Sequence, residues 1–508
     1  MEEHKSIKCF PIEIDFELDF CTNNAKIYTV DRIPYYLKRL SSVDEVSSVD
    51  EVSSLYRVFS RVSSDSSSKK KFLVIEIWTQ LDDGDNGHFN NAPLYIRPSI
   101  LIILSIISYL LDHPLTIYEI SFEADWITCP DRKPNEIKVS KFVHDEVDKS
   151  TDLFMILEAV YEKEEKVNEF LVSLLSRWHK ARFLEEQSDA NLYYEESFLV
   201  YFHIIELCSE HYSKQQVEEV EEQIKKFTRE LFSTTLKLRD NQVGQIIKDK
   251  YKVFRSILIP DGRISITSKV SYFLDRVKLL DIKTQYFVEQ LVKVRNSIAH
   301  GRPVKHETLN WPLPPFFLIS DNVENFILEI RVFTARIIGA YLSLEAWVDQ
   351  WVDVHSWLDM PPEYVEKFIS DNSFEHITPT DFLKGTINSV RPSSLLKQFY
   401  LKNDKVLFRD IERGLRSFML NVEVEGESAL EIFEAAIVLA DSLDKELSNR
   451  CRSIVIDIHE NDLVFYLNIR HILRQVEQQL KDKVKDKDKD KIKLIWFREW
   501  IESADHIS

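Results

Sequence analysis

The chain has 508 residues, a net charge of −19 at pH 7 and only 9 glycines. This shortage of glycine argues against glycine-rich phosphate loops and against an all-β fold with many tight turns, and it favours helices. The acidic balance argues against a surface built for general nucleic-acid binding, although it is compatible with a local basic site. A chain of this length is expected to hold about two to four domains.

The cysteines and the apolar stretches bear on where the protein resides. The 5 cysteines are odd in number and include no Cys-x-x-Cys pair, so we expect neither a disulfide framework nor a cysteine zinc site. The N-terminus lacks the apolar core of a signal peptide. The most apolar run, Ile100–Leu111, has about a dozen residues, fewer than the roughly 18–20 that span a bilayer. We therefore predict a cytoplasmic protein that does not contact membranes.

Residues 1–130 are predicted to form a strand-rich, mixed β/α domain. Phe10–Phe20 alternates apolar and acidic residues, as a half-buried strand does, and Lys71–Gln80 is a second strand pattern. Pro98–Leu111 is predicted to be a buried helix, and Thr116–Trp126 again alternates. Asp82–Asn91 is rich in carboxylates but lacks the ligand spacing and terminal Glu of a calcium loop, so a solvated turn is expected. A sensing or docking role suits this domain.

The remainder of the chain is predicted to be helical, which makes the fold mainly α. Apolar residues at i, i+3 and i+4 spacing and short links predict an up-down bundle over 150–345. A helical C-terminal extension is expected over 346–508. The expected bundle helices are Leu153–Ala181, Asn191–Tyr212, Val217–Leu236, Ser265–Leu280, Lys283–His300 and Val323–Leu344. The expected helices of the extension include Glu427–Leu447, Asn461–Leu480 and Ile492–Ile501.

Leu291–Arg302, which reads LVKVRNSIAHGR, is the most informative stretch for function. Its apolar residues recur at helical spacing, and Gly301 stands where a left-handed helix cap is expected. Asn296 and His300 are four residues apart and share one helix face, with the long side chain of Arg295 beside them. A fixed cation, an amide and a titratable base at one helix end can act on a phosphodiester.

The spacing of Arg295 and His300 is not informative by itself. About two Arg and His pairs at such spacing are expected by chance in a chain of this composition. The second such pair, Arg452 and His459, lies in an apolar strand or buried helix and has no Asn after the Arg. Asn296 directly after Arg295 lowers the chance expectation to roughly a tenth.

RNSIAH at 295–300 resembles the RNxxxH form of the HEPN superfamily motif. The surrounding order is also similar: an aromatic helix such as Asn191–Tyr212, then the motif helix, then a closing helix. The resemblance covers about 190–345 and is closest to Apea-like HEPN proteins of bacterial anti-phage defence. It implies a HEPN-type helical bundle and a metal-independent endoribonuclease that works as a homodimer through this domain, without a cofactor. No HExxH sequence or clustered His and Asp set indicates a metal.

The chemistry of RNA is compatible with this set of residues. RNA carries its own nucleophile, the 2′-hydroxyl, so the enzyme must move protons and stabilise a charged phosphorane. His300 is expected to be the general acid or base, since an imidazole titrates near neutral pH. Arg295 would hold the phosphate, and Asn296 would orient His300 or a phosphate oxygen. One helix supplies one histidine, so a two-fold interface that pairs two such helices would complete the site.

Several residues are candidates for support, and each has an ordinary structural alternative. Glu206 could contact Arg295 or His300, or could be a helix-surface glutamate, and His203 could be a core or interface histidine. Arg295 could bridge two helices, with His300 as a C-terminal cap favoured by the helix dipole. Arg302 stands where some subfamilies carry a tyrosine as a modification target, which disfavours the antitoxin type. The basic residues expected near the site are Lys293, Arg302 and His306.

The sequence thus predicts an endoribonuclease of prokaryotic, abortive-infection-type defence with RNA as substrate. Its flanking domains would keep it inactive until an unknown phage-derived or cellular trigger arrives. The alternative is a catalytically silent HEPN scaffold that binds RNA or a partner protein.

Overall fold

The computed structural model divides into two compact units, the first of 1–279, 291–304 and 316–351 and the second of 280–290, 305–315 and 352–508. The strand-rich region and the bundle, expected as separate domains, therefore lie in one compact unit. The second unit takes in most of the expected extension. The structure describes residues 2–32, 56–59, 71–81, 92–116, 122–126, 133–162, 165–187, 190–239, 242–244, 246, 251, 253, 255, 264–300, 320–386, 390–400, 406–424, 428–461 and 494–504.

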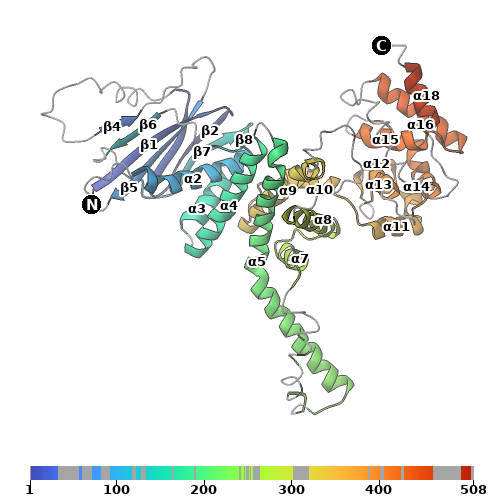
Figure 1. The fold of residues 1–508 in the computed structure, drawn as a ribbon, viewed down its shortest axis with the longest axis horizontal. Coiled ribbons are helices and arrows are strands. Elements are labelled where there is room, and N and C mark those ends of the chain that lie inside the picture. The colour runs from blue at the N-terminus through green and yellow to red at the C-terminus, as the bar shows by residue number, and fades with distance from the viewer. Residues whose placement is uncertain are drawn as a thin grey trace. The chain divides into compact units, whose positions relative to one another are not determined.

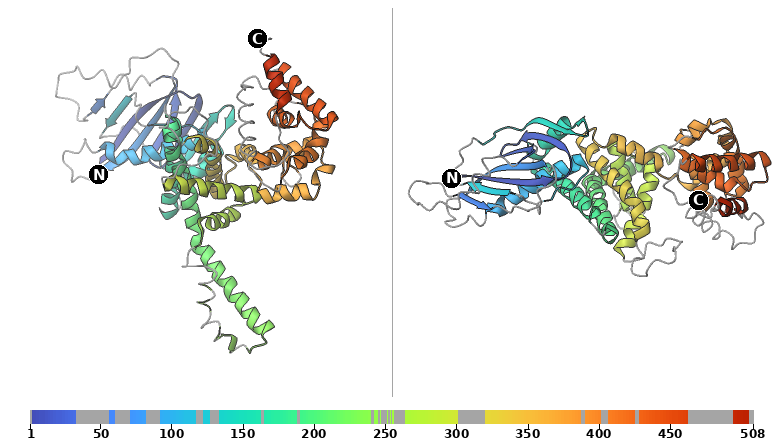
Figure 2. Two further views of the ribbon diagram at one scale, coloured as in Figure 1. Left: turned by 45° about the vertical axis from the view of Figure 1, so that its right-hand side comes forward. Right: turned by 90° about the horizontal axis from the view of Figure 1, so that it is seen from above.

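In the described residues, eight strands form an antiparallel sheet in the N-terminal part of the first unit, in the order β4-β6-β1-β5-β3-β2-β7-β8. The longest described pairing joins β1 to β5 over their whole length, from Glu2 opposite Leu81 to Ile12 opposite Lys71. The strands twist, as Figure 2 shows. Their bounds are β1 Glu2–Ile12, β2 Phe16–Cys21, β3 Ala25–Val30, β4 Tyr56–Phe59, β5 Lys71–Leu81, β6 Phe122–Trp126, β7 Lys138–His144 and β8 Val147–Asp148.

The expected strand over Phe10–Phe20 is corrected to two strands. The chain bends at Glu13–Asp15, and the residues before and after the bend pair with different neighbours. An alternating pattern records which face a residue takes but not where a strand turns. The strand expected at Lys71–Gln80 is confirmed as β5, and Thr116–Trp126 is confirmed over its described end as β6. Because β7 and β8 also join, the sheet extends past residue 130.

The helix α2, Ala92–Leu111, is a layer between the sheet and the helices that follow. It contacts β5 on one side and α3 and α4 on the other (Figure 1). The expected helix from Pro98 is thus confirmed, but it begins six residues earlier, and Pro98 lies inside it. The side chains of Ile103, Leu104 and Ile107 are completely buried. Their burial explains why sheet and bundle form one unit, since apolar surface on both sides of α2 is removed from water.

Two boundaries in the bundle differ from the expected ones. The helix expected over Leu153–Ala181 is instead two helices, of which the first ends at Tyr161 and the second begins at Glu165. The helices expected as Asn191–Tyr212 and Val217–Leu236 are instead one helix, because no glycine or proline interrupts the chain between them. The bundle comprises α3 Ser150–Tyr161, α4 Glu165–Glu185, α5 Ala190–Glu230 with the π-turn Leu231–Thr235, α7 Ile266–Arg276, α8 Ile282–Ala299 and α9 Ser320–Leu342.

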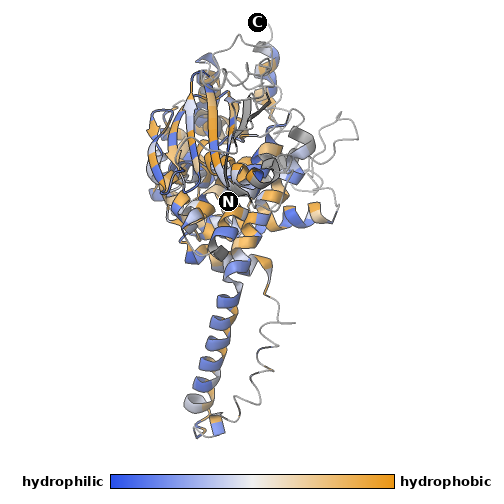
Figure 3. Ribbon diagram, turned by 90° about the vertical axis from the view of Figure 1, so that its left-hand side faces the viewer, coloured by the Kyte–Doolittle hydropathy of each residue, from blue (hydrophilic) through white to orange (hydrophobic). Residues whose placement is uncertain are grey.

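The inner part of α5 and its outer part have different surroundings. Phe198, Tyr201 and Ile205 are buried against α4 and α9. Beyond Tyr212, α5 still contacts α7 as far as Glu219, and its outer part then extends away from the other helices of this unit (Figure 1) and is mostly hydrophilic (Figure 3). It carries an ion pair in which Arg255 Nε lies 2.9 Å from Glu221 Oε1.

A buried network of charges joins α2, α4, α5 and α9. Arg331 donates to Glu185 over 2.8 Å, and the other oxygen of that carboxylate accepts from the Tyr201 hydroxyl at 3.0 Å. Arg182 donates to Asp112 over 2.8 Å and lies 2.7 Å from Glu186. The side chains of Arg182, Glu185 and Arg331 are 10%, 13% and 15% exposed. Each helix of the network therefore contributes a polar or charged side chain whose partner lies on another segment of this unit.

The second unit is an assembly of short helices around one apolar core. Its buried side chains include Ile411, Phe433, Ile454 and Phe497. The expected helix over Glu427–Leu447 is corrected to two helices, because Asp444 caps a new helix by accepting from the N–H groups of Glu446 and Leu447. The terminal helix expected at Ile492–Ile501 is confirmed as α18, whereas Asn461–Leu480 lies almost wholly outside the described residues. The described helices are α10 Val348–Trp357, whose residues 348–351 belong to the first unit, α11 Pro362–Ser370, the 3₁₀ turn Ser373–His376, α12 Pro379–Lys384, α13 Pro392–Tyr400, α14 Phe408–Asn421, α15 Ala429–Leu439, α16 Lys445–Glu460 and α18 Ile495–Ala504.

Asp281 caps the start of α8 and gives a pH-dependent contribution to stability. Its carboxylate accepts from the Thr284 N–H at 2.8 Å, and His355 Nε2 lies 2.7 Å from its other oxygen. Burial alone would raise the pKa of Asp281, but the contacts with His355 and Thr284 lower that pKa from 3.8 to about 2. A lowered carboxylate pKa stabilises the fold above the ordinary pKa, and the contribution is lost as pH falls through the folded pKa.

We expect Asp281→Asn to destabilise the second unit by about 1 kcal/mol at pH 6, a value reduced because the carboxylate is half exposed. The difference from wild type should disappear as the pH falls from about 4 to 2, which urea unfolding at several pH values measures. A difference that stays constant over this range would contradict the assignment.

None of the described helices is both long enough and apolar enough to cross a bilayer.

Candidate active site at the end of α8

Helix α8 positions the candidate residues through its buried face. Leu291 is completely buried and Val294 is 7% exposed, as the sequence predicts, while Ile298 is only partly buried. The helix ends at Ala299, and the His300 N–H donates to the Asn296 carbonyl at 3.1 Å. The opposite face therefore presents its polar residues near the last turn. The expected cap at Gly301 lies outside the described residues.

Arg295 is held by two partners. Its Nη2 donates to Glu206 Oε1 over 2.8 Å, and its Nη1 donates to Asn296 Oδ1 over 3.2 Å. Its guanidinium carbon also lies 6.0 Å from the ring centre of Phe202, at the outer limit of a cation–π contact. Arg295 is 33% exposed and Glu206 25% exposed, so the pair lies at the edge of the bundle. The structure thus brings Glu206 together with Arg295 and Asn296, and the helix bridge weighed from the sequence is formed.

His300 is exposed at the end of α8. Within the described part of the chain, its imidazole makes no hydrogen bond or ion pair, and only its backbone N–H is engaged. Lys293 is exposed on the same helix. Arg302 and His306, the other candidates for support, lie outside the described residues. The described site is therefore an anchored guanidinium and amide beside an imidazole that is open to solvent.

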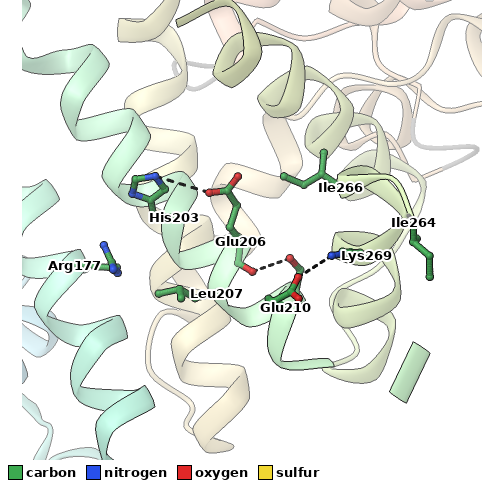
Figure 4. Close-up of a pocket in the computed structure, with 9 residues that line it drawn as sticks. Arg177, His203, Glu206, Leu207, Glu210, Ile264, Ile266 and Lys269 are labelled. Atoms are coloured by element: carbon green, nitrogen blue, oxygen red, sulfur yellow. Dashed lines mark hydrogen bonds and ion pairs between the residues drawn. The ribbon is translucent and has the colours of Figure 1, made fainter. Parts of the chain in front are cut away.

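Glu206 also lies close to His203, a histidine of its own helix. His203 Nε2 lies 3.8 Å from Glu206 Oε2, one helical turn earlier on α5, so the two carboxylate oxygens point at different residues. These residues line one end of a pocket of about 470 Å³ between α4, α5 and α7 (Figure 4). Arg177 faces it from α4 and Lys269 from α7. Glu206 thus connects the end of α8 with this pocket.

Sequence reasoning did not find Arg177, Lys269 or the pocket itself. Arg177 lies within a stretch read only as an amphipathic helix, and Lys269 within another. The three helices meet only in the folded chain, so no local spacing relates these residues. Among the described side chains, no three His, Cys, Asp or Glu gather closely enough to hold a metal ion.

Comparison with known proteins gives no relative for this chain. No model of a known protein family matches the sequence, and no match is found among curated proteins or among solved structures.

Proposed function

We propose that this protein is a metal-independent endoribonuclease with a HEPN-type bundle and that Arg295, Asn296 and His300 are its catalytic residues. The observation that carries the proposal is the anchored guanidinium of Arg295 in the last turns of α8, the helix whose end carries the exposed side chain of His300. The RNxxxH resemblance of 295–300 supports the same assignment.

The geometry suits phosphodiester chemistry because the site offers a fixed cation and a solvent-exposed imidazole. A guanidinium has five N–H donors, so its bonds to Glu206 and Asn296 leave donors for a phosphate. Glu206 fixes its orientation, which preorganises the positive charge for the phosphorane. His300 takes the proton of the 2′-hydroxyl or gives one to the leaving 5′-oxygen. The partner histidine comes from a second copy of the chain across a two-fold axis.

The biological setting of the proposal is prokaryotic anti-phage defence in the cytoplasm. An unregulated ribonuclease is toxic to its own cell, so the sheet and the second unit would hold it inactive until a phage-derived or cellular trigger arrives. The finding that sheet and bundle share one compact unit supports such coupling.

Arg295→Ala tests the function directly. We expect wild type to cleave RNA in the presence of EDTA and Arg295→Ala to cleave about a hundredfold more slowly, because the phosphorane loses its fixed cation. Gel analysis of end-labelled RNA measures both rates.

The matched control is Lys214→Ala, which removes an 89% exposed cation from α5 and should cleave at the wild-type rate. Equal rates for Arg295→Ala and wild type would refute the proposed site. Loss of wild-type cleavage in EDTA would indicate a metal site instead.

A second candidate function is a catalytically silent scaffold that binds RNA or a partner protein. The observation in its favour is that Glu206 already neutralises Arg295, as in an ordinary bridge between helices. RNA binding without cleavage by wild type, with the Arg295 and Glu206 contact needed only for stability, would establish this alternative.

A further inference from the structure

The pocket between α4, α5 and α7 has the size and the charges of a binding site. Its volume of about 470 Å³ falls within the usual range for sites that take small molecules, roughly 300–1,000 Å³. One stripe of α5 forms its floor, with His203, Glu206, Leu207 and Glu210 at successive turns (Figure 4).

Arg177 is the feature of the pocket that most needs explanation. Its partly exposed side chain lines the pocket from α4. Within the described ranges, no carboxylate pairs with its guanidinium. A guanidinium without a carboxylate partner keeps N–H donors for the oxygens of an anion, and such charge-assisted hydrogen bonds are strong. Arg177 therefore favours an anion in this pocket.

The carboxylates of the pocket do not compensate Arg177, because each already faces another cation. Glu210 Oε2 lies 2.7 Å from Lys269 Nζ, and Glu206 Oε1 lies 2.8 Å from Arg295 Nη2. These two pairs are close to neutral. The uncompensated charge of the lining is thus the single positive charge of Arg177, which matches one phosphodiester group.

The other wall of the pocket is apolar. Ile264 and Ile266 line it from the start of α7, and Leu207 lines it from α5. Such side chains suit the flat face of a nucleobase. A ligand that carries one negative charge and one planar apolar group satisfies both walls, and a nucleotide is such a ligand.

We propose that this pocket binds one nucleotide of the RNA strand next to the phosphate that is cleaved, with its phosphate on Arg177 and its base against Ile264 and Ile266. The assignment to RNA rests on the proposed function, because Glu206 joins the pocket to Arg295. The same nucleotide chemistry could come from a free nucleoside monophosphate, which the experiment distinguishes.

Fluorescence anisotropy with a short single-stranded RNA tests the proposal. The RNA carries 2′-O-methyl groups throughout, so the nucleophile is blocked and binding is measured without cleavage. We expect Arg177→Gln to raise the Kd about tenfold, since one charge-assisted contact is lost. Ile266→Trp should raise it similarly by filling the base end of the pocket without a change of charge.

Lys180→Gln is the matched control, since it removes an exposed cation from the same helix α4. It should leave the Kd within about twofold of wild type, because one exposed cation contributes little. Binding by Arg177→Gln that equals that of Lys180→Gln would overturn the proposal. Amide hydrogen exchange of α4 and α5 verifies that each variant is folded.

Two further arms separate this proposal from the proposed function. Arg177-dependent RNA binding without cleavage of unmodified RNA by wild type refutes the ribonuclease and supports the pocket. Cleavage of unmodified RNA by wild type, together with unchanged RNA binding by Arg177→Gln, supports the ribonuclease and refutes the pocket. Arg177-dependent binding of 5′-AMP, with RNA affinity unchanged, reassigns the pocket to a free nucleotide and overturns its role as an RNA subsite.

Discussion

Replacement of His300 by alanine is expected to lower the rate of RNA cleavage by about a thousandfold, the middle of the range for loss of a general acid or base. The imidazole is exposed, and only the backbone N–H of this residue is engaged among the described contacts. Its removal should therefore leave α8 and the Arg295 and Glu206 pair intact. Initial rates on end-labelled RNA and the Kd for 2′-O-methyl RNA measure the two effects, and the Kd should change less than about twofold.

His376→Ala provides the control for this substitution. His376 is an exposed histidine at the end of a short 3₁₀ turn in the second unit, and its removal should not alter cleavage. A His300→Ala protein that cleaves as fast as His376→Ala would exclude His300 from the chemistry.

The composite site can be tested with the same variant. An excess of His300→Ala protein mixed with wild type should depress the wild-type rate, since most wild-type chains would then be paired with an inactive copy. Analytical ultracentrifugation establishes the assembly state. A strictly monomeric protein that cleaves at the full rate would refute the two-chain site.

The second large effect concerns Glu185, where alanine is expected to destabilise the first unit by about 3–5 kcal/mol. Burial raises the pKa of Glu185, and Arg331 and Arg182 offset part of that rise. Removal of the carboxylate leaves the buried guanidinium of Arg331 and the hydroxyl of Tyr201 without this acceptor. Amide hydrogen exchange in α4 and α9 measures the loss within this unit, since the chain holds two units and is not expected to unfold in one step.

Glu186→Ala is the matched control for the buried network, because Glu186 follows Glu185 directly and its side chain is 32% exposed. We expect it to cost about 1 kcal/mol or less. The combination of Glu185→Ala with Arg331→Ala should be less destabilising than the two effects added together, as for groups in one network. Equal effects of the two glutamate substitutions would show that burial of the network contributes nothing.

The sequence-based predictions are accurate where the structure depends on signals within a few residues of the chain. The extents of α7 and α9 are close to the expected ones because capping and apolar periodicity act within a few residues, as at Ser265, which caps α7. The single helix α5 is expected as two from the sequence, although no glycine or proline separates the two stretches. The bend at Glu13–Asp15 gives no comparable local signal.

In the candidate site, too, features that depend on local spacing are predicted from the sequence, and features that depend on packing are not. The line of Asn296 and His300 on one helix face follows from spacing alone, and Glu206 was a candidate because it lies on the preceding aromatic helix. That Glu206 contacts Arg295 directly, and that Arg177 and Ile266 enclose a pocket beside it, depends on how α4, α5 and α7 pack. Such packing is a property of the whole chain, and no short pattern encodes it.

The length of α5 gives Glu206 a mechanical connection to a distant surface. The helix continues without glycine or proline for 24 residues from Glu206 to Glu230, about 36 Å. Along this stretch α5 is tied to α7, through Glu210 with Lys269 and through Glu219 with Arg276. A rotation of α5 by roughly 20° would move a carboxylate about 6 Å from the helix axis by roughly 2 Å, enough to separate Glu206 from Arg295. A molecule that binds the outer part of α5 would therefore have to displace α7 as well before it altered the candidate site.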